Sequence, residues 1–297
     1  MINRAAIAWL LLGLIWGTNF VFIKWSTDVV SPPQVTLVRV LVGFIIVALY
    51  ASITGQLKLS HLKYSLHFFV MSCLAAALYF YGFAEGTALL KSGLAGAVSA
   101  AIPLFSLLAA IILLPDEKMT FQRMGGLLLG LIGVVLIAKP FSSDLGENLL
   151  QGVLWMTLGS FSLGVSFVYA RKFITPLAIP AAALTTYQLG FGSVILFAVT
   201  DINGISVLTE HPQALWVLVI GLGLIGTGIA YVLYYYIIEK LGAVKASALT
   251  YVPPVVALFL GAVLLGEDIA VIDILATILI FAGVIFINKK HTVKNKQ

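Results

Sequence analysis

Long apolar stretches, separated by short polar connections, run through almost the whole chain of 297 residues. A transmembrane α-helix needs about 20 mostly apolar residues to cross roughly 30 Å of hydrocarbon. Ten stretches meet that length: 5–25, 32–53, 66–89, 91–114, 120–139, 150–172, 179–200, 212–237, 244–265 and 270–288. The pattern therefore predicts an all-α polytopic membrane protein with ten transmembrane helices.

The second half of the chain repeats the first. Five landmarks recur 150 positions later, and the pairs are Tyr81 and Tyr231, Pro103 and Pro253, Glu117 and Glu267, Gly133 and Gly283, Ile137 and Ile287. Upstream, GTNFVFIK at 17–24 matches GVSFVYAR at 164–171. Because each copy has an odd number of spans, the second copy must enter the membrane from the opposite side, as in inverted-repeat transporters. We expect a five-helix repeat at 1–140, an inverted one at 148–290, and a basic cytoplasmic tail at 291–297.

Composition and charge agree with a membrane location. The chain is 61% hydrophobic and 10% charged, with a mean hydropathy of +1.09, which leaves too little polar surface for a water-soluble protein. If the N-terminus is inside, thirteen of the seventeen Lys and Arg residues lie inside, three lie outside, and Arg39 falls within a span. This bias predicts that both termini are cytoplasmic. The net charge of +5 then reflects topology and the basic tail, which can touch anionic lipid headgroups, and not nucleic-acid binding.

Catalytic, redox and metal signatures are missing from the sequence. Cys73 is the only cysteine, so no intrachain disulfide can form. The four histidines are scattered, and no G-x-S-x-G, H-E-x-x-H or Walker A motif is present. We therefore expect no enzyme activity, no cofactor and no metal site. Any uphill transport would draw on a gradient of solute or of protons.

Three runs of sequence resemble a known family. They are LIWGTNFVFIK in the first span, the segment 99–137 with its proline-to-acidic pattern, and its repeat within 231–287. Together they resemble the EamA family of the drug/metabolite transporter superfamily over nearly the whole chain. The resemblance implies a ten-helix secondary transporter that works by alternating access, in a family with exporters of amino acids and other metabolites and some importers.

On this resemblance we expect an exporter of a small polar metabolite, such as an amino acid, in the bacterial cytoplasmic (inner) membrane. Its partners would then be a small-molecule substrate, membrane lipid and, as a candidate coupling ion, the proton. The alternatives are a nucleotide-sugar or lipid-linked solute carrier and a non-transporting membrane scaffold. The sequence leaves the oligomeric state open.

Prolines lie near the middle of the fourth and ninth predicted spans. Pro103 occupies one position, and Pro253 with Pro254 occupies the equivalent position 150 residues later. Proline removes one helical hydrogen bond and displaces the carbonyl four residues earlier. Exposed backbone at that depth is tolerated only against protein or water. We therefore expect these prolines to act as hinges that line a central cavity, although each could also be a plain structural kink.

Polar and aromatic side chains gather near the same depth. Tyrosine suits a binding site there because it offers an apolar face and one hydroxyl group. Tyr79 is one of these side chains, with the interfacial belt as the alternative, and Trp16 fits either a cavity or a packing role. The candidate substrate-binding residues are Asn19, Arg39, Tyr81, Glu85, Ser99, Tyr187, Tyr231 and Thr250.

Arg39 is the sharpest candidate. It lies roughly 10 Å into its span at 1.5 Å per residue, where a charge costs at least ~2.5 kcal/mol and usually faces a cavity or a partner. Glu85 lies at a comparable depth, so we expect an Arg39–Glu85 pair or an anion contact made by Arg39, with Glu85 as a candidate proton carrier. The alternative is that Arg39 snorkels to the interface. Glu117 and Glu267 are each expected to stabilise the helix that follows, because a carboxylate interacts favourably with the N-terminal end of the helix dipole.

Overall fold

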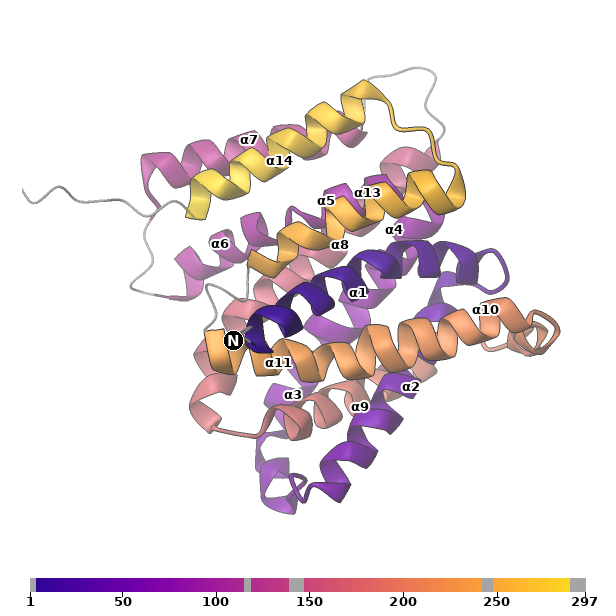
Figure 1. Cartoon of the computed structure of the whole chain (residues 1–297). Coiled ribbons are helices and arrows are strands. Elements are labelled where there is room, and N and C mark those ends of the chain that lie inside the picture. Colours follow the sequence, from indigo (N-terminus) through magenta and orange to yellow (C-terminus); the bar gives the residue numbers. More distant parts are fainter. Residues whose placement is uncertain (1–3, 115–118, 139–146, 242–247, 289–297) are drawn as a thin grey trace, which may run out of the picture.

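The computed structural model describes residues 4–114, 119–138, 147–241 and 248–288, and all regular structure in these ranges is helical (Figure 1). Seven helical stretches are long and apolar enough to cross a membrane: Arg4–Thr27, Pro32–Ile53, Leu59–Leu89, Ser92–Leu113, Asn148–Leu177, Ala181–Val199 and Pro212–Tyr234. Three shorter apolar helical stretches are Phe121–Ile137, Leu249–Leu265 and Val271–Phe286.

Several of these stretches are built of more than one helical element. The first half comprises α1 (Arg4–Thr27), α2 (Pro32–Ile53), η1 (Leu59–Tyr64), α3 (Ser65–Ser72), η2 (Cys73–Ala77), α4 (Leu78–Leu89), α5 (Ser92–Ser99), α6 (Ile102–Leu113) and α7 (Phe121–Ala138). The second half comprises α8 (Glu147–Tyr169), η3 (Ala170–Ile174), η4 (Thr175–Leu177), α9 (Ala181–Val199), η5 (Ile205–Glu210), α10 (Pro212–Trp216), η6 (Val217–Ile229), α11 (Ala230–Leu241), η7 (Ala248–Tyr251), α13 (Val252–Leu265) and α14 (Val271–Asn288).

The helices lie side by side in one bundle (Figure 1). The α7 and α14 helices pack along each other at one edge, whereas α2 packs against α9 and η6 at the other. Between these edges, α1 packs on α13, and α6 packs on α8. The start of α1 and the end of α14 lie toward the same side of the bundle, at the left of Figure 1.

Two membrane stretches are broken at the predicted prolines. The fourth stretch divides between α5 and α6, and Pro103 sits in the first turn of α6. The ninth changes from η7 to α13, with Pro253 and Pro254 in the first turn of α13. The first turn tolerates proline because its N–H groups have no partner within the helix. Each break therefore lies just before the prolines, where the chain starts a new helix.

Three π-helical segments, η2, η3 and η6, were not expected from the sequence. Side chains from other helices satisfy carbonyl groups of η2. The Ser162 hydroxyl donates to the Leu74 carbonyl at 2.6 Å, and the Tyr231 hydroxyl donates to the Ala75 carbonyl at 2.8 Å. Because π-helical turns are uncommon and occur often at functional sites, these segments are relevant to the site below.

Charged side chains also cap helix ends from a distance. The Lys24 ammonium group donates to the Ala88 carbonyl at 2.8 Å and the Leu90 carbonyl at 3.0 Å, at the C-terminal end of α4. The Glu267 carboxylate accepts from the Ser92 backbone N–H at 2.6 Å and from the Gly93 N–H at 3.1 Å. Both contacts satisfy backbone groups that a helix end leaves unpaired.

The expectation for Glu267 was correct in its chemistry and wrong in its target. Glu267 caps α5, in the other half of the chain, and not the helix that follows it. Before α14, Asp273 accepts from the Ala270 N–H at 3.2 Å instead. Tertiary packing brings the two halves together here, which sequence spacing cannot reveal. Glu117 lies outside the described residues.

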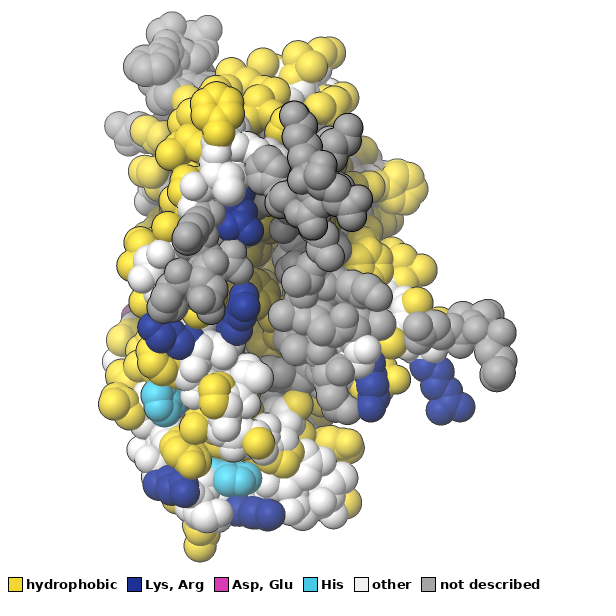
Figure 2. Space-filling model, turned by 90° about the vertical axis from the view of Figure 1, so that its left-hand side faces the viewer, with side chains coloured by type: hydrophobic (Ala, Val, Ile, Leu, Met, Phe, Trp, Pro, Cys, Tyr) yellow, Lys and Arg dark blue, Asp and Glu magenta, His cyan; other side chains and the backbone are white. Residues whose placement is uncertain are grey.

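Basic side chains gather at one end of the bundle. Figure 2 looks onto the end where α1 begins, and dark blue Lys and Arg side chains are spread over it. Exposed basic residues in the connections of this end include Lys58, Lys63, Arg171 and Lys172. This is the end that the charge bias predicts to be cytoplasmic.

Candidate functional site

A cavity of about 480 Å³, including its open mouth, lies between the two broken stretches. The lining residues come from both halves of the chain, and they are Trp16, Asn19, Phe20, Ile23, Arg39, Tyr79, Phe83, Ser99, Ile102, Leu163, Thr250 and Pro253.

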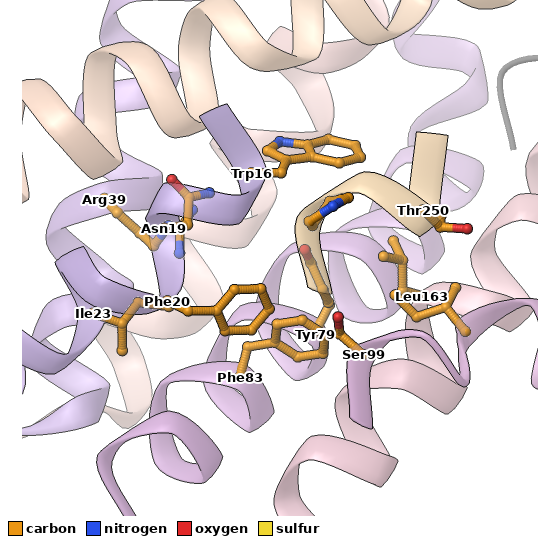
Figure 3. Close-up of a pocket in the computed structure, with 12 residues that line it drawn as sticks. Trp16, Asn19, Phe20, Ile23, Arg39, Tyr79, Phe83, Ser99, Leu163 and Thr250 are labelled. Carbon is orange, nitrogen blue, oxygen red and sulfur yellow. The ribbon is translucent and has the colours of Figure 1, made fainter. Parts of the chain in front are cut away.

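One face of α1 and one face of α4 supply half of the lining residues. Trp16, Asn19, Phe20 and Ile23 share a face of α1 because they are spaced by three and four residues. Figure 3 shows Arg39 and Asn19 at one side of the cavity, Ser99 and Thr250 at the other, and the Phe20 and Tyr79 rings between them. The cavity thus has two polar ends and an aromatic middle.

Arg39 supplies the only charged group among the described lining residues. Its side chain is 2% exposed, so its charge is withdrawn from water. The Nε–H group donates to the Thr227 hydroxyl oxygen at 3.3 Å, and the guanidinium carbon lies 4.1 Å from the centre of the Phe80 ring. In the amide orientation that satisfies both neighbours, Asn19 accepts from Arg39 Nη2 at 3.3 Å and donates to the Ile15 carbonyl at 3.2 Å.

Arg39 and Glu85 do not form the ion pair that the sequence suggested. Among the described residues, the Arg39 partners are the neutral groups given above. Glu85 is outside the cavity lining and lies near Tyr81, one helical turn earlier. The two residues have similar depths, but their helices present them in different directions. The buried guanidinium therefore faces the cavity without a carboxylate partner in the described part of the chain.

The opposite end of the cavity is formed at the helix breaks. Ser99 ends α5, and its hydroxyl donates to the Gly96 carbonyl at 2.6 Å. Thr250 and Pro253 line the cavity from η7 and the first turn of α13. Asn19, Arg39, Ser99, Thr250 and Pro253 are thus brought together as the sequence suggested, whereas Pro103 and Pro254 lie outside the lining.

Three predicted tyrosines have other contacts. The Tyr81 ring packs edge-on against Trp155 with ring centres 5.4 Å apart. Tyr187 donates from its hydroxyl to the Lys58 carbonyl at 3.0 Å, at the end of the bundle seen in Figure 2. Tyr231 is buried and bonds the Ala75 carbonyl in η2. These side chains support helix packing, and none of them lines the cavity.

The sequence analysis also missed residues that do line the cavity. Tyr79 was not among the candidate substrate-binding residues, but it lines the cavity and packs on Phe83 with ring centres 4.6 Å apart. The four-residue spacing of these two rings was a usable signal. Thr227, which contacts Arg39 from η6, gave no signal in an apolar stretch. Phe20, Ile23, Ile102 and Leu163 look like ordinary packing residues in the sequence.

Comparisons with known proteins agree with this architecture. The model of the EamA-like transporter family matches the chain twice, at 3–139 and at 150–289. The uncharacterized transporter YdfC of Bacillus subtilis (strain 168) is 27% identical over 288 residues, which cover 97% of this chain and 91% of that protein. The uncharacterized inner membrane transporter YedA of Escherichia coli (strain K12) is 28% identical over 281 residues, which cover 92% of this chain and 87% of that protein.

The fold is also found among solved structures. A crystal structure aligns with a TM-score of 0.61 and 22% identity over 95% of both chains. The overall fold therefore also occurs in a solved structure, and the family match extends over both halves of the chain. This chain belongs to the EamA-like transporter family, and it is an integral membrane transporter.

Proposed function

We propose that this protein is a secondary transporter that exports a small metabolite bearing a carboxylate, such as an amino acid, by alternating access. One observation carries the proposal, namely the buried Arg39 guanidinium that faces the cavity without a carboxylate partner among the described residues. A guanidinium has no acceptor and matches a carboxylate with two parallel N–H donors. A substrate carboxylate would compensate this charge.

The remaining lining supports a small amphipathic substrate. Phe20, Tyr79 and Phe83 offer an apolar surface for a side chain of the substrate. Beyond them, Ser99 and Thr250 offer hydroxyl groups beside the helix breaks. An amino acid with its carboxylate at Arg39 would place its side chain on this aromatic surface. If no solute entered the cavity, the Arg39 guanidinium would remain a costly buried charge.

The proposed architecture is two inverted five-helix repeats in which the three shorter apolar helices also cross the membrane, with both termini cytoplasmic. Several findings support it. The family model matches each half once, and the two helix breaks are separated by the same 150 positions as the sequence landmarks. The contact of α1 with α13 has its counterpart in the contact of α8 with α6.

Energy would come from a gradient of solute or protons. Glu85 is outside the cavity lining, so a proton carried there would act without direct contact with the substrate. We therefore place substrate recognition at Arg39 and treat coupling as a separate step. The protein would need neither a catalytic group nor a cofactor for this cycle.

Counterflow in reconstituted vesicles tests the proposal. Vesicles loaded with the twenty unlabelled standard amino acids are diluted into the same mixture carrying isotope labels, and uptake of each is measured by mass spectrometry. We expect the wild type to exchange at least one of them, Arg39→Ala to exchange it at least about tenfold more slowly, and the exposed-site control Arg171→Ala to match the wild type. Lack of exchange by the wild type, or normal exchange by Arg39→Ala, would contradict the proposal.

A further inference from the structure

Thr227 is the hydrogen-bond partner of Arg39 in a neighbouring helix. The threonine lies in η6 and is completely buried. Its hydroxyl oxygen accepts from Arg39 Nε–H at 3.3 Å, and the same hydroxyl donates to the Leu222 carbonyl at 2.8 Å. Thr227 does not itself line the cavity. It can therefore act on a substrate only through Arg39.

The two hydrogen bonds of Thr227 fix its direction. A hydroxyl group has one proton, and here that proton is engaged by Leu222. The oxygen can then present only lone pairs to its other side, where Arg39 Nε–H lies. The threonine is consequently held as an acceptor, which is the role that a guanidinium requires, since arginine has donors alone.

The π-helical backbone and small residues make this contact possible. Leu222 precedes Thr227 by five residues, which is the spacing of π-helical hydrogen bonds. At Gly43 in α2, an added Cβ would lie 2.7 Å from the Thr227 methyl carbon, so glycine lets the two helices approach. At Gly226, an added Cβ would overlap the Asn19 side-chain amide group. The segment η6 thus admits both polar neighbours of Arg39.

These contacts leave one part of the guanidinium available. Thr227 occupies the Nε–H group, Asn19 takes one donor of Nη2, and Phe80 lies against the flat face. A guanidinium has five N–H donors, so Nη1 and Nη2 each keep at least one for another acceptor. A carboxylate that binds with two hydrogen bonds must then use the Nη1–Nη2 end, because the Nε side is occupied.

We infer that Thr227 is a positioning residue that holds Arg39 so that its two Nη groups receive the substrate carboxylate end-on. The inference rests on the proposed function, in which Arg39 recognises that carboxylate. It adds a specificity determinant in the second half of the chain, contributed by a residue that touches no substrate. Loss of the Thr227 acceptor frees the Nε side, and the guanidinium then samples other orientations.

Nuclear magnetic resonance of the arginine side chains tests the orientation without any substrate. The chain has four arginines, so ¹⁵N-arginine labelling gives few Nε–H signals, and Arg39→Lys assigns the one from Arg39. We expect this Nε–H to exchange slowly with solvent in the wild type and in Thr227→Ser, and at least about tenfold faster in the near-isosteric Thr227→Val. Thr186→Val, which removes a buried hydroxyl bonded within α9, is the matched control.

Transport kinetics test the role. In counterflow of the twenty-amino-acid mixture, Thr227→Val should raise the KM of the exchanged amino acids about tenfold with little change in maximal rate, because one hydrogen bond to a charged group is lost. Thr227→Ser and Thr186→Val should retain the wild-type KM. Gly43→Ala displaces the Thr227 methyl group while keeping its hydroxyl, so it should also raise the KM. This variant replaces Thr227→Val in the test if Thr227→Val folds poorly.

The outcomes separate this inference from the proposed function. Normal exchange by Arg39→Ala would refute the carboxylate site itself. If Arg39→Ala is inactive while Thr227→Val keeps both slow Nε–H exchange and the wild-type KM, Arg39 recognition stands and the positioning role of Thr227 is overturned. Faster Nε–H exchange with a higher KM in Thr227→Val, with both quantities unchanged in Thr227→Ser and Thr186→Val, would support the inference.

Discussion

The two halves of the molecule use equivalent helices differently, and α2 and α9 show this most clearly. Gly43-Phe44 in α2 matches Gly190-Phe191 in α9 when the shift is 147 residues, the same shift as for 17–24 and 164–171. At this shift Arg39 corresponds to Thr186. The α2 residue brings a charge to the cavity, whereas the Thr186 hydroxyl donates to the Ala182 carbonyl of its own helix at 2.8 Å.

The difference teaches how a duplicated scaffold can hold an asymmetric substrate. Helix breaks occur in both halves at equivalent positions, so the cavity itself follows the duplication. The cation comes from one half only, and on the α9 side Gln188 donates its amide to the Ala75 carbonyl at 3.3 Å instead of entering the cavity. A substrate with one carboxylate would therefore bind in one orientation, with that group toward α1 and α2.

The largest effect is expected when the Arg39 charge, which only one half contributes, is removed. Arg39→Ala should lower exchange of amino acids in vesicles by roughly ten- to hundredfold or more, because hydrogen bonds to a charged group contribute about 1.5–3 kcal/mol. Thr186→Ala, at the equivalent position, should leave exchange unchanged. Arg39→Lys should restore exchange only in part because the two-pronged geometry is lost. Equal loss in Arg39→Ala and Thr186→Ala would contradict the asymmetric site.

A smaller effect is expected where Glu267 contacts the start of α5, at the end of the bundle opposite the one that Figure 2 shows. Glu267→Ala should lower the free energy of unfolding by about 1–2 kcal/mol, since a helix cap on α5 is lost. The exposed neighbour Asp268 provides the control Asp268→Ala. Unfolding in mixed micelles with increasing dodecyl sulfate measures both. Equal stability of Glu267→Ala and the wild type would show that the cap is not stabilising.

Replacing the repeat-related tyrosines, Tyr81 and Tyr231, by phenylalanine should change the free energy of unfolding by a smaller amount. Tyr231→Phe removes the buried hydroxyl bond to the Ala75 carbonyl in η2 and should cost about 1 kcal/mol of unfolding free energy. Tyr81→Phe should cost less, because Tyr81 is only partly buried. The same micelle unfolding experiment compares them, and an equal or larger loss in Tyr81→Phe would refute the assignment of roles.

The smallest expected effect is at Glu85. Because Glu85 is outside the cavity and does not pair with Arg39, Glu85→Gln should leave the KM for counterflow within about twofold of the wild-type value, which is less than the loss of one net hydrogen bond would produce. Counterflow needs no imposed gradient, so this measurement isolates recognition from coupling. A large rise in KM would return Glu85 to the binding site.

Sequence reasoning recovered the features whose physical cause is local. Long apolar stretches identified the helical segments, and Pro103 and Pro253 marked the breaks because proline cannot continue a preceding helix normally. Arg39 was found because a charge within a span needs a cavity or a partner. Each of these signals depends on a residue and its immediate neighbours along the chain.

The remaining errors come from helix rotation and packing, which a single sequence does not specify. Glu85 and Tyr187 were at plausible depths, but their helices turn them away from the cavity. Glu267 caps a helix that lies 175 residues away in the chain. The sequence does not reveal the π-helical turn that brings Thr227 to Arg39, because the turn lies in an apolar stretch and the contact forms only where two helices meet.

The most direct test of the account compares each amino acid with the amine formed by removing its carboxylate. Wild-type vesicles are assayed by counterflow with labelled L-phenylalanine and phenethylamine, L-leucine and isoamylamine, and the other available pairs. Recognition at Arg39 predicts that every amino acid exchanged by the wild type loses its exchange when the carboxylate is removed. Exchange of the amines at rates equal to those of their parent amino acids would contradict the central claim that Arg39 selects a carboxylate.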